Sequence, residues 1–365
     1  MDREQIVKGY EYAKSAFAEL GVDVDQAIAR IDRIPISMHC WQGDDVIGFE
    51  GSGALTGGIQ TTGSYPGRAR TADELRKDAE FAMKLIPGET KLNLHASYAE
   101  KNGRDVDRDQ YTIAEFQAWA DWAKENGIGL DFNPTFFSHP MMDGDFSLAS
   151  LDESKRRFWI EHGKRCREIA LEFAKQTGKP CAVNYWMPDG FKDTCADTKL
   201  YRDVMRASLD EIFAAEIDPE LVPCAVDKVL LHVSRGVRWD SDHVITHDDE
   251  LQKIMDEIVF NGFDRRVLIG LDYFDASINR IAAWVIGTRN ARKALLYAAL
   301  APIGQIRQAE VDGDLTARLA LMEERKNLPA CAVWEYYLMS KGIPAGDAWL
   351  AKVKDYEETV LARRT

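Results

Sequence analysis

One imidazole and two carboxylates follow an apolar, strand-like run in this chain of 365 residues. His232 lies in the run Lys228-Val-Leu-Leu-His-Val, and Asp240 and Asp242 follow it with one residue between them. Imidazole nitrogens and carboxylate oxygens bind borderline to hard divalent cations such as Mn²⁺, Co²⁺ or Zn²⁺. Taken alone, the pattern also fits a solvated acidic loop, because short motifs of this kind often match by chance.

A second strand-like run favours the metal interpretation. The segment from Arg266 to Asp272 is apolar in its middle and again ends in a carboxylate. Two successive strands that end in ligand-type side chains indicate a shared site. We therefore predict that His232, Asp240, Asp242 and Asp272 bind metal.

Other predicted strands also carry polar and aromatic residues in their second halves. The predicted strands are 34–41, 91–98, 128–136, 181–187, 228–235 and 265–274. His39 and Trp41, His95, Asn133 and Trp186 lie toward the carboxyl ends of the first four strands. A single strand histidine is more often a hydrogen-bonded packing residue than a ligand. The same bias in six strands instead points to a site at the end where (β/α)₈ barrels build theirs.

Helical patterns alternate with these strands, which predicts a parallel sheet made of βα units. The first helix begins near residue 3 and ends near Gly21, and later helical patterns cover 72–86, 112–126, 153–177, 198–216 and 248–261. The last seventy or so residues also have helical composition. We predict a barrel with its N-terminal helix over 1–290 and a helical extension over 291–365.

Composition excludes several classes of function. The net charge of −14 argues against a nucleic-acid partner, because phosphate binding requires clustered cations. No run of about 20 apolar residues predicts a membrane span, so we expect a cytoplasmic protein. The six cysteines show no C-x-x-C spacing, which argues against a thiolate zinc site or a disulfide framework. The glycine-rich segment 48–58 lacks the lysine of a phosphate-binding loop, and we interpret it as a lid.

Several long segments resemble L-rhamnose isomerases, and the resemblance runs nearly from end to end. The segments that carry it are His39-Cys-Trp-Gln-Gly-Asp-Asp, Gly57-Gly-Ile-Gln-Thr-Thr-Gly, Leu92-Asn-Leu-His, Asp131-Phe-Asn-Pro-Thr, His232-Val-Ser-Arg, Arg238-Trp-Asp-Ser-Asp-His and Gly270-Leu-Asp-Tyr-Phe-Asp.

The resemblance implies a (β/α)₈ barrel similar to xylose isomerase, two divalent cations and interconversion of L-rhamnose and L-rhamnulose. Asp240 and Asp242 match ligands of a catalytic Mn²⁺, while His232 and Asp272 match those of a second ion, for which Zn²⁺ or Co²⁺ are alternatives. His95 matches a sugar contact; Trp41, Phe136 and Trp186 are expected in the substrate pocket. We expect Asp272 and His95 to be catalytic, and the subunits to form a homotetramer.

One departure from the family pattern lies near Val226 and Asp227. Segments that supply a bridging glutamate, an aspartate, a histidine and a lysine are missing between the helix at 198–216 and the strand at 228–235. The chain thus has about six recognisable βα units where a closed barrel has eight.

Two functional alternatives follow from this gap. The first is a metal-dependent isomerase that moves hydride between C1 and C2, although an enediol route with a carboxylate base also fits. The second is an impaired or silent relative that keeps sugar binding or subunit association. A metal hydrolase on a similar barrel has less support.

Overall fold

The structure is a computed structural model that describes residues 2–50, 65–191, 193–227, 249–265, 267–271 and 277–364. The predicted metal ligands His232, Asp240, Asp242 and Asp272 lie outside these residues, as do the predicted strand 228–235 and most of the glycine-rich segment.

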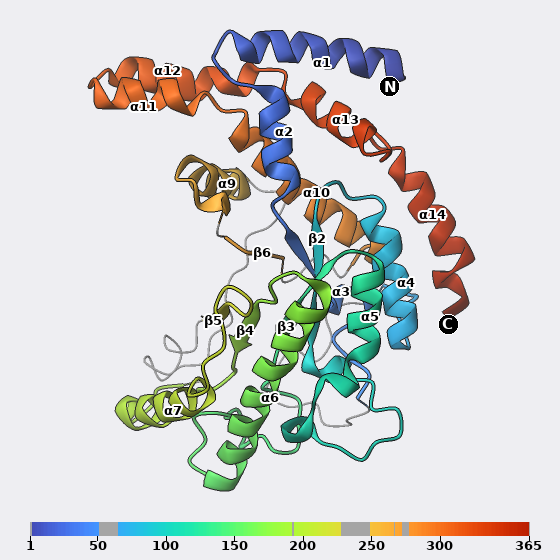
Figure 1. The fold of residues 1–365 in the computed structure, drawn as a ribbon, viewed down its shortest axis with the longest axis vertical. Coiled ribbons are helices and arrows are strands. Elements are labelled where there is room, and N and C mark those ends of the chain that lie inside the picture. Colours follow the sequence, from blue (N-terminus) through green and yellow to red (C-terminus); the bar gives the residue numbers. More distant parts are fainter. Residues whose placement is uncertain are drawn as a thin grey trace.

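Six parallel strands form one curled sheet at the centre of the chain (Figure 1). They are β1 (Ile36–His39), β2 (Thr90–His95), β3 (Gly129–Asn133), β4 (Val183–Trp186), β5 (Cys224–Asp227) and β6 (Ile269–Gly270). The spatial order is β5-β4-β3-β2-β1-β6, so the last strand pairs with the first. The carboxyl ends of all six strands therefore lie at the same end of the sheet.

A buried ion pair fixes the register of the middle strands. Lys91 of β2 pairs with Asp131 of β3, and both side chains are almost completely buried. The ammonium of Lys91 also donates to the carbonyl of Pro180 at 2.7 Å, and Asp131 accepts from the amide of Ala182 at 2.7 Å. Because a buried charge without its partner is costly, these contacts favour this alignment of β2, β3 and β4 over a shifted one.

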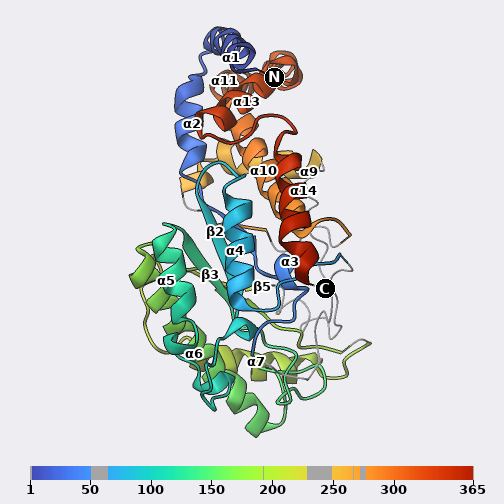
Figure 2. The ribbon, with the colours of Figure 1, turned by 90° about the vertical axis from the view of Figure 1, so that its right-hand side faces the viewer.

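Helices from the βα units pack on the outer side of the sheet (Figures 1 and 2). They are α4 (Ala72–Met83), α5 (Gln117–Glu125), α6 (Glu153–Thr177), α7 (Thr198–Ile212) and α9 (Asp249–Phe260). Short helices α3 (Trp41–Asp44), η1 (Ala96–Tyr98), η2 (Arg108–Gln110), η3 (Ile113–Glu115) and η4 (Phe263–Arg265) lie in the connections. Alternation of strand and helix therefore follows the predicted βα pattern.

Most of the terminal helices form one end of the elongated molecule, and the last of them runs back alongside α4 to the C-terminus (Figure 2). They are α1 (Arg3–Ala18), α2 (Val24–Asp32), α10 (Arg280–Ala299), α11 (Ile303–Val311), α12 (Leu315–Glu324), η5 (Arg325–Asn327), α13 (Ala330–Ser340), α14 (Trp349–Thr359) and η6 (Leu361–Arg364). The rings of Tyr10 on α1 and Tyr336 on α13 stack with centroids 3.6 Å apart. The N-terminal helix is thereby packed on a helix of the C-terminal extension.

Helix α10 joins the terminal helices to the sheet. The guanidinium of Arg292 is buried and donates to the carbonyls of Ile31 and Ile34, before β1, and of Glu89, before β2. This single side chain therefore secures the start of two strands. The helix also crosses the predicted domain boundary at 290/291 without a break.

The mixed α/β class and the parallel sheet are confirmed, but the described residues do not close an eight-stranded barrel. A cleft of about 1980 Å³ lies at the amino ends of the strands, lined among others by Pro35, Pro180, Pro223 and Leu268. It is thus at the end of the sheet opposite the predicted site. Among the described residues, no helix is both long and apolar enough to cross a membrane.

Candidate functional site

Four strand ends bring together a compact group of imidazole and aromatic rings. The group consists of His39, Trp41, His95, Phe137 and Trp186. Ring centroids lie 4.3 Å apart for Trp41 and His95, and 5.4 Å apart for Phe137 and Trp186. We call these five residues the ring cluster. Three predicted substrate residues, Trp41, His95 and Trp186, are members of it.

Helix α10 contacts the end of β1, which carries His39 of the ring cluster. The indole N–H of Trp284 donates to the carbonyl of His39 at 2.8 Å. This approach depends on Gly43, where an added Cβ would lie 2.9 Å from the Trp284 ring and 2.0 Å from Leu75. Any larger residue at 43 would displace the helix that follows β1.

His95 is completely buried at the end of β2 and bonds on both ring nitrogens. Its Nδ1 lies 2.9 Å from Oγ1 of Thr135, and its Nε2 lies 3.3 Å from Nε2 of His39. Burial lowers the pKa of His95 well below its usual value, and the neighbouring His39 and Arg108 lower it further. The imidazole is therefore neutral, with one ring nitrogen that acts as a hydrogen-bond acceptor.

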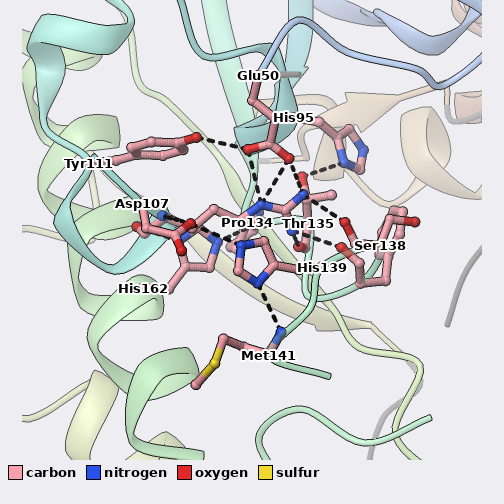
Figure 3. Close-up of polar contacts among 12 residues, drawn as sticks. Glu50, His95, Asp107, Tyr111, Pro134, Thr135, Ser138, His139, Met141 and His162 are labelled. Carbon is pink, nitrogen blue, oxygen red and sulfur yellow. Dashed lines mark hydrogen bonds and ion pairs between the residues drawn. The ribbon is translucent and has the colours of Figure 1, made fainter. Parts of the chain in front are cut away.

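The loop after β3 is fixed by a buried ion pair, Arg108 with Glu50 (Figure 3). Arg108 donates to the carbonyls of Thr135 at 2.5 Å and Phe137 at 2.7 Å, while Glu50 accepts from the Tyr111 hydroxyl at 2.8 Å. Burial alone would raise the pKa of Glu50, but Arg108 lowers it below its ordinary value. Glu50 is thus a carboxylate that holds the guanidinium against the loop.

The loop after β4 is tied to the loop after β3 by Asp189. This completely buried carboxylate accepts from the amide and hydroxyl of Ser147, at 2.8 and 2.5 Å, and from the amide of Ala149 at 2.7 Å. Burial raises the pKa of Asp189 to about 6, even though these hydrogen bonds act in the opposite direction. The contacts hold the segment that follows Trp186.

A second buried carboxylate, Asp44, anchors the chain that leads toward the glycine-rich segment. It accepts from the hydroxyl of Tyr98 and from the amide of Gly48, the latter at 2.7 Å. Burial raises the pKa of Asp44 to about 7. Next to it, Asp45 has a φ of 62° and forms a two-pronged buried ion pair with Arg280, at 2.5 and 2.8 Å.

The fourth predicted substrate residue, Phe136, lies apart from the ring cluster. Its ring is buried against Trp159 and His162 of α6 and against Tyr185 of β4. Its neighbour Phe137 contacts the ring cluster instead. The two rings therefore face different sides of the loop.

No metal ligand set forms among the residues that the structure describes. No three His, Cys, Asp or Glu side chains there gather in a way that could hold a cation. The predicted ligands lie outside those residues, so their placement is not tested.

Sequence reasoning missed the residues that hold the site. Thr135 lies in the segment Asp131-Phe-Asn-Pro-Thr, which carries the family resemblance, but nothing in the sequence marks its hydroxyl as the partner of His95. Arg108 and Glu50 lie far apart in sequence and show no periodic pattern, so only the folded chain brings them together. A buried arginine preceded by Asp107, in a segment rich in charge, gives no local signal that distinguishes it from a surface residue.

Comparison with known proteins identifies the family. The sequence model of L-rhamnose isomerase (RhaA) matches residues 4–227 and 221–364. The L-rhamnose isomerase of Rhodopirellula baltica is 47% identical over 416 positions, covering 99% of this chain and 97% of the relative. Those of Citrobacter koseri and Escherichia coli O157:H7 are each 46% identical, and 99% of both chains is covered in each case.

The same comparisons locate the internal gap. An alignment of 416 positions with a chain of 365 residues leaves at least 51 positions at which this chain has no residue. The two family matches meet at 221–227, where the sequence predicted missing βα units. Outside this junction the match is continuous from residue 4 to residue 364, and the chain belongs to the L-rhamnose isomerase family.

Proposed function

We propose that this chain is a metal-dependent aldose–ketose isomerase that interconverts L-rhamnose and L-rhamnulose. The observation that carries the proposal is the ring cluster, which stands at the carboxyl ends of β1 to β4 in a member of this family. Indole and phenyl faces suit the carbon-bound hydrogens of a sugar, and imidazole nitrogens suit its hydroxyl groups.

Each member of the ring cluster has a proposed part in binding. Trp41 and Trp186 would contact the apolar face and methyl group of the sugar, with Phe137 filling the wall between them. Phe136 would support that wall from the α6 side. His95, neutral and buried, would accept a hydroxyl proton as the sugar ring opens.

The proposed cation site uses His232, Asp240, Asp242 and Asp272. One imidazole and three carboxylates fit Mn²⁺ by donor type, and Zn²⁺ or Co²⁺ would fit at a second position. When bound, the cation would stabilise negative charge on O1 and O2 of the open sugar. Asp272 would take up and return a hydroxyl proton while hydrogen moves between C1 and C2, by our proposal as hydride.

The gap at 221–227 supports a second proposal, that this shortened chain is a slow isomerase. β6 pairs with β1 as the last strand of a closed barrel does, so two further βα units would fit between β5 and β6. Those units would bring a bridging glutamate and further ligands in the family pattern. Without them we expect weak cation binding and reduced turnover, with sugar binding retained.

We further propose a homotetramer assembled through the C-terminal extension. Helix α12 and the residues before it expose Val311, Leu315 and Leu319, whose exposed fractions are 82%, 59% and 55%. Leu315 and Leu319, spaced by four residues, lie on one face of α12, and Val311 ends the preceding helix α11. An exposed apolar face on a protruding hairpin is typical of a subunit contact (Figure 1).

An assay of the purified chain tests the main proposal. L-rhamnose is incubated with and without Mn²⁺, and L-rhamnulose is measured by NMR, with an aldohexose 6-phosphate, whose C1 and C2 are free to react, as the phosphorylated comparison. We expect conversion of the free sugar only, because the glycine-rich segment 48–58 lacks the lysine of a phosphate-binding loop. Equal turnover of the sugar phosphate, or an absence of both turnover and sugar binding, contradicts it.

A further inference from the structure

Thr135 holds an unusual backbone conformation directly beside the ring cluster. Its φ is 58°, in the left-handed region that β-branched residues rarely adopt, and its side chain is buried. Such a conformation persists only where surrounding contacts impose it. Here the amide of Thr135 donates to Oδ1 of Asn133 at 2.9 Å, and its carbonyl accepts from Arg108 at 2.5 Å.

The contacts around His39 and His95 fix where their protons lie. The backbone N–H of Trp41 can only donate, and it points at Nδ1 of His39 at 3.3 Å. His39 must therefore carry a proton on Nε2, which can donate to Nε2 of His95 at 3.3 Å. His95 in turn must carry its proton on Nδ1 and donate it to Oγ1 of Thr135 at 2.9 Å.

The hydroxyl of Thr135 completes this one-directional series. Having accepted from His95, it donates to the carbonyl of Asn133 at 3.3 Å. The Arg108 guanidinium, paired with Glu50, holds the Thr135 carbonyl on the other side of the residue. The Asn133 carbonyl thus takes the hydroxyl hydrogen and leaves the Thr135 oxygen as an acceptor for His95, and Arg108 holds the backbone of the same residue. His95 and Thr135 lie side by side in Figure 3.

We propose that Thr135 is a positioning residue that holds His95 in the tautomer with hydrogen on Nδ1 and an unprotonated Nε2. The Arg108–Glu50 pair supports it by holding the loop. The consequence for turnover rests on the proposed function: only an unprotonated Nε2 can accept a sugar hydroxyl proton. The tautomer itself does not depend on activity.

Replacing the Thr135 hydroxyl by a methyl group removes the hydrogen-bond acceptor of His95 without changing the volume of the side chain. In Thr135→Val the volume is kept, but the Nδ1–H of His95 is left without an acceptor in a buried site. The opposite tautomer would direct two Nε2–H groups of His95 and His39 at each other unless His39 gives up its bond from Trp41. We therefore expect a mixture of tautomers or a rotated ring.

The test uses the full chain labelled with ¹⁵N-histidine and long-range ¹H–¹⁵N correlation spectra of the imidazoles. Signals of His95 are assigned by their absence in His95→Asn. The wild type and Thr135→Ser, which keeps the hydroxyl, should show the Nδ1–H pattern, and Thr135→Val should lose it. Thr288→Val is the matched control, because the buried Thr288 hydroxyl has no hydrogen-bond partner within the described part of the chain.

Every outcome decides the proposal. An Nε2–H pattern in the wild type, or an unchanged Nδ1–H pattern in Thr135→Val, overturns the proposal. If the valine variant fails to fold, the spectra of the wild type and of Thr135→Ser still test the tautomer of His95. In an active preparation, Thr135→Val should lower kcat about tenfold or more with little change in KM, relative to Thr288→Val. Inactivity of all variants counts against the proposed function alone, because the spectra still report the tautomer.

Discussion

Nε2 of His39 and Nε2 of His95 lie 3.3 Å apart at the ends of the adjacent strands β1 and β2. At this distance the two nitrogens share one hydrogen, so Nε2 of His95 is the acceptor in this pair. The pair is held on one side by the Trp41 amide and on the other by the Thr135 hydroxyl. It is the clearest acid–base unit among the described residues.

Loss of the His95 imidazole should reduce turnover strongly. We expect His95→Asn to lower kcat for L-rhamnose by a factor of roughly 10² or more, since a positioned acid or base contributes on that order. His139→Asn is the control, because His139 bonds to Asp107 and to the amide of Met141, outside the ring cluster. Equal kcat values for the two variants would exclude His95 from the reaction.

Removal of a predicted ligand should lower cation content. Asp240→Asn and Asp242→Asn should each reduce bound Mn²⁺ and turnover together, because each loses a coordinating carboxylate. Elemental analysis of the purified proteins gives the metal content. Asp203→Asn, which breaks an exposed ion pair with Lys199, should leave it unchanged. Wild-type metal content in both ligand variants would disprove the assignment.

Asp44 should make the free energy of unfolding depend on pH. Its pKa is raised to about 7 in the folded protein, above the ordinary value of an unfolded aspartate. Between about pH 4 and 7 the folded state therefore binds more protons than the unfolded state, and its stability falls as pH rises, by at most about 1.4 kcal/mol per pH unit.

Asp44→Asn removes the contribution of this carboxyl group to the pH dependence of the free energy of unfolding. The stability of the variant relative to the wild type should therefore increase from pH 4 to pH 7.5, as measured by urea unfolding at a series of pH values. A stability difference that does not change with pH would show that Asp44 does not titrate in this range in the folded protein.

The exposed face of α12 should control assembly. The double replacement of Leu315 and Leu319 by Glu should convert the expected tetramer to smaller species, because like charges would be brought into an apolar contact. Light scattering after size exclusion gives the mass. Leu151→Glu places the same charge on a different exposed leucine and should not change it. An unaltered tetramer in the double variant would show that the exposed face of α12 is not the subunit interface.

Local patterns predicted the secondary structure well where capping residues mark the ends. The helix expected over 153–177 has those bounds, since Asp152 caps its first turn and Gly178, with a φ of 69°, ends it. The strand predicted over 128–136 extends three residues beyond the carboxyl end of β3, because Pro134 and the left-handed Thr135 end β3 at Asn133. Alternation along a strand therefore could not decide between Phe136 and Phe137.

The candidate site was predicted in part. His95, Trp41 and Trp186 could be chosen because parallel strands bring their carboxyl ends together. Arg108 could not, because its partners are Glu50 and backbone carbonyls after β3, which only the tertiary fold places around it. The predicted ligands at 232, 240, 242 and 272 lie outside the described residues and remain predictions.

The most direct test compares this chain with a version that has the missing segment restored. The residues that the Rhodopirellula baltica relative has opposite the gap are inserted at the Val226–Asp227 junction, and both proteins are titrated with Mn²⁺ by calorimetry and assayed with L-rhamnose. We predict that the 365-residue chain binds Mn²⁺ weakly and forms L-rhamnulose slowly, and that the insertion increases both affinity and turnover. Tight binding at two sites and equally fast turnover in the chain without the insertion would contradict this account.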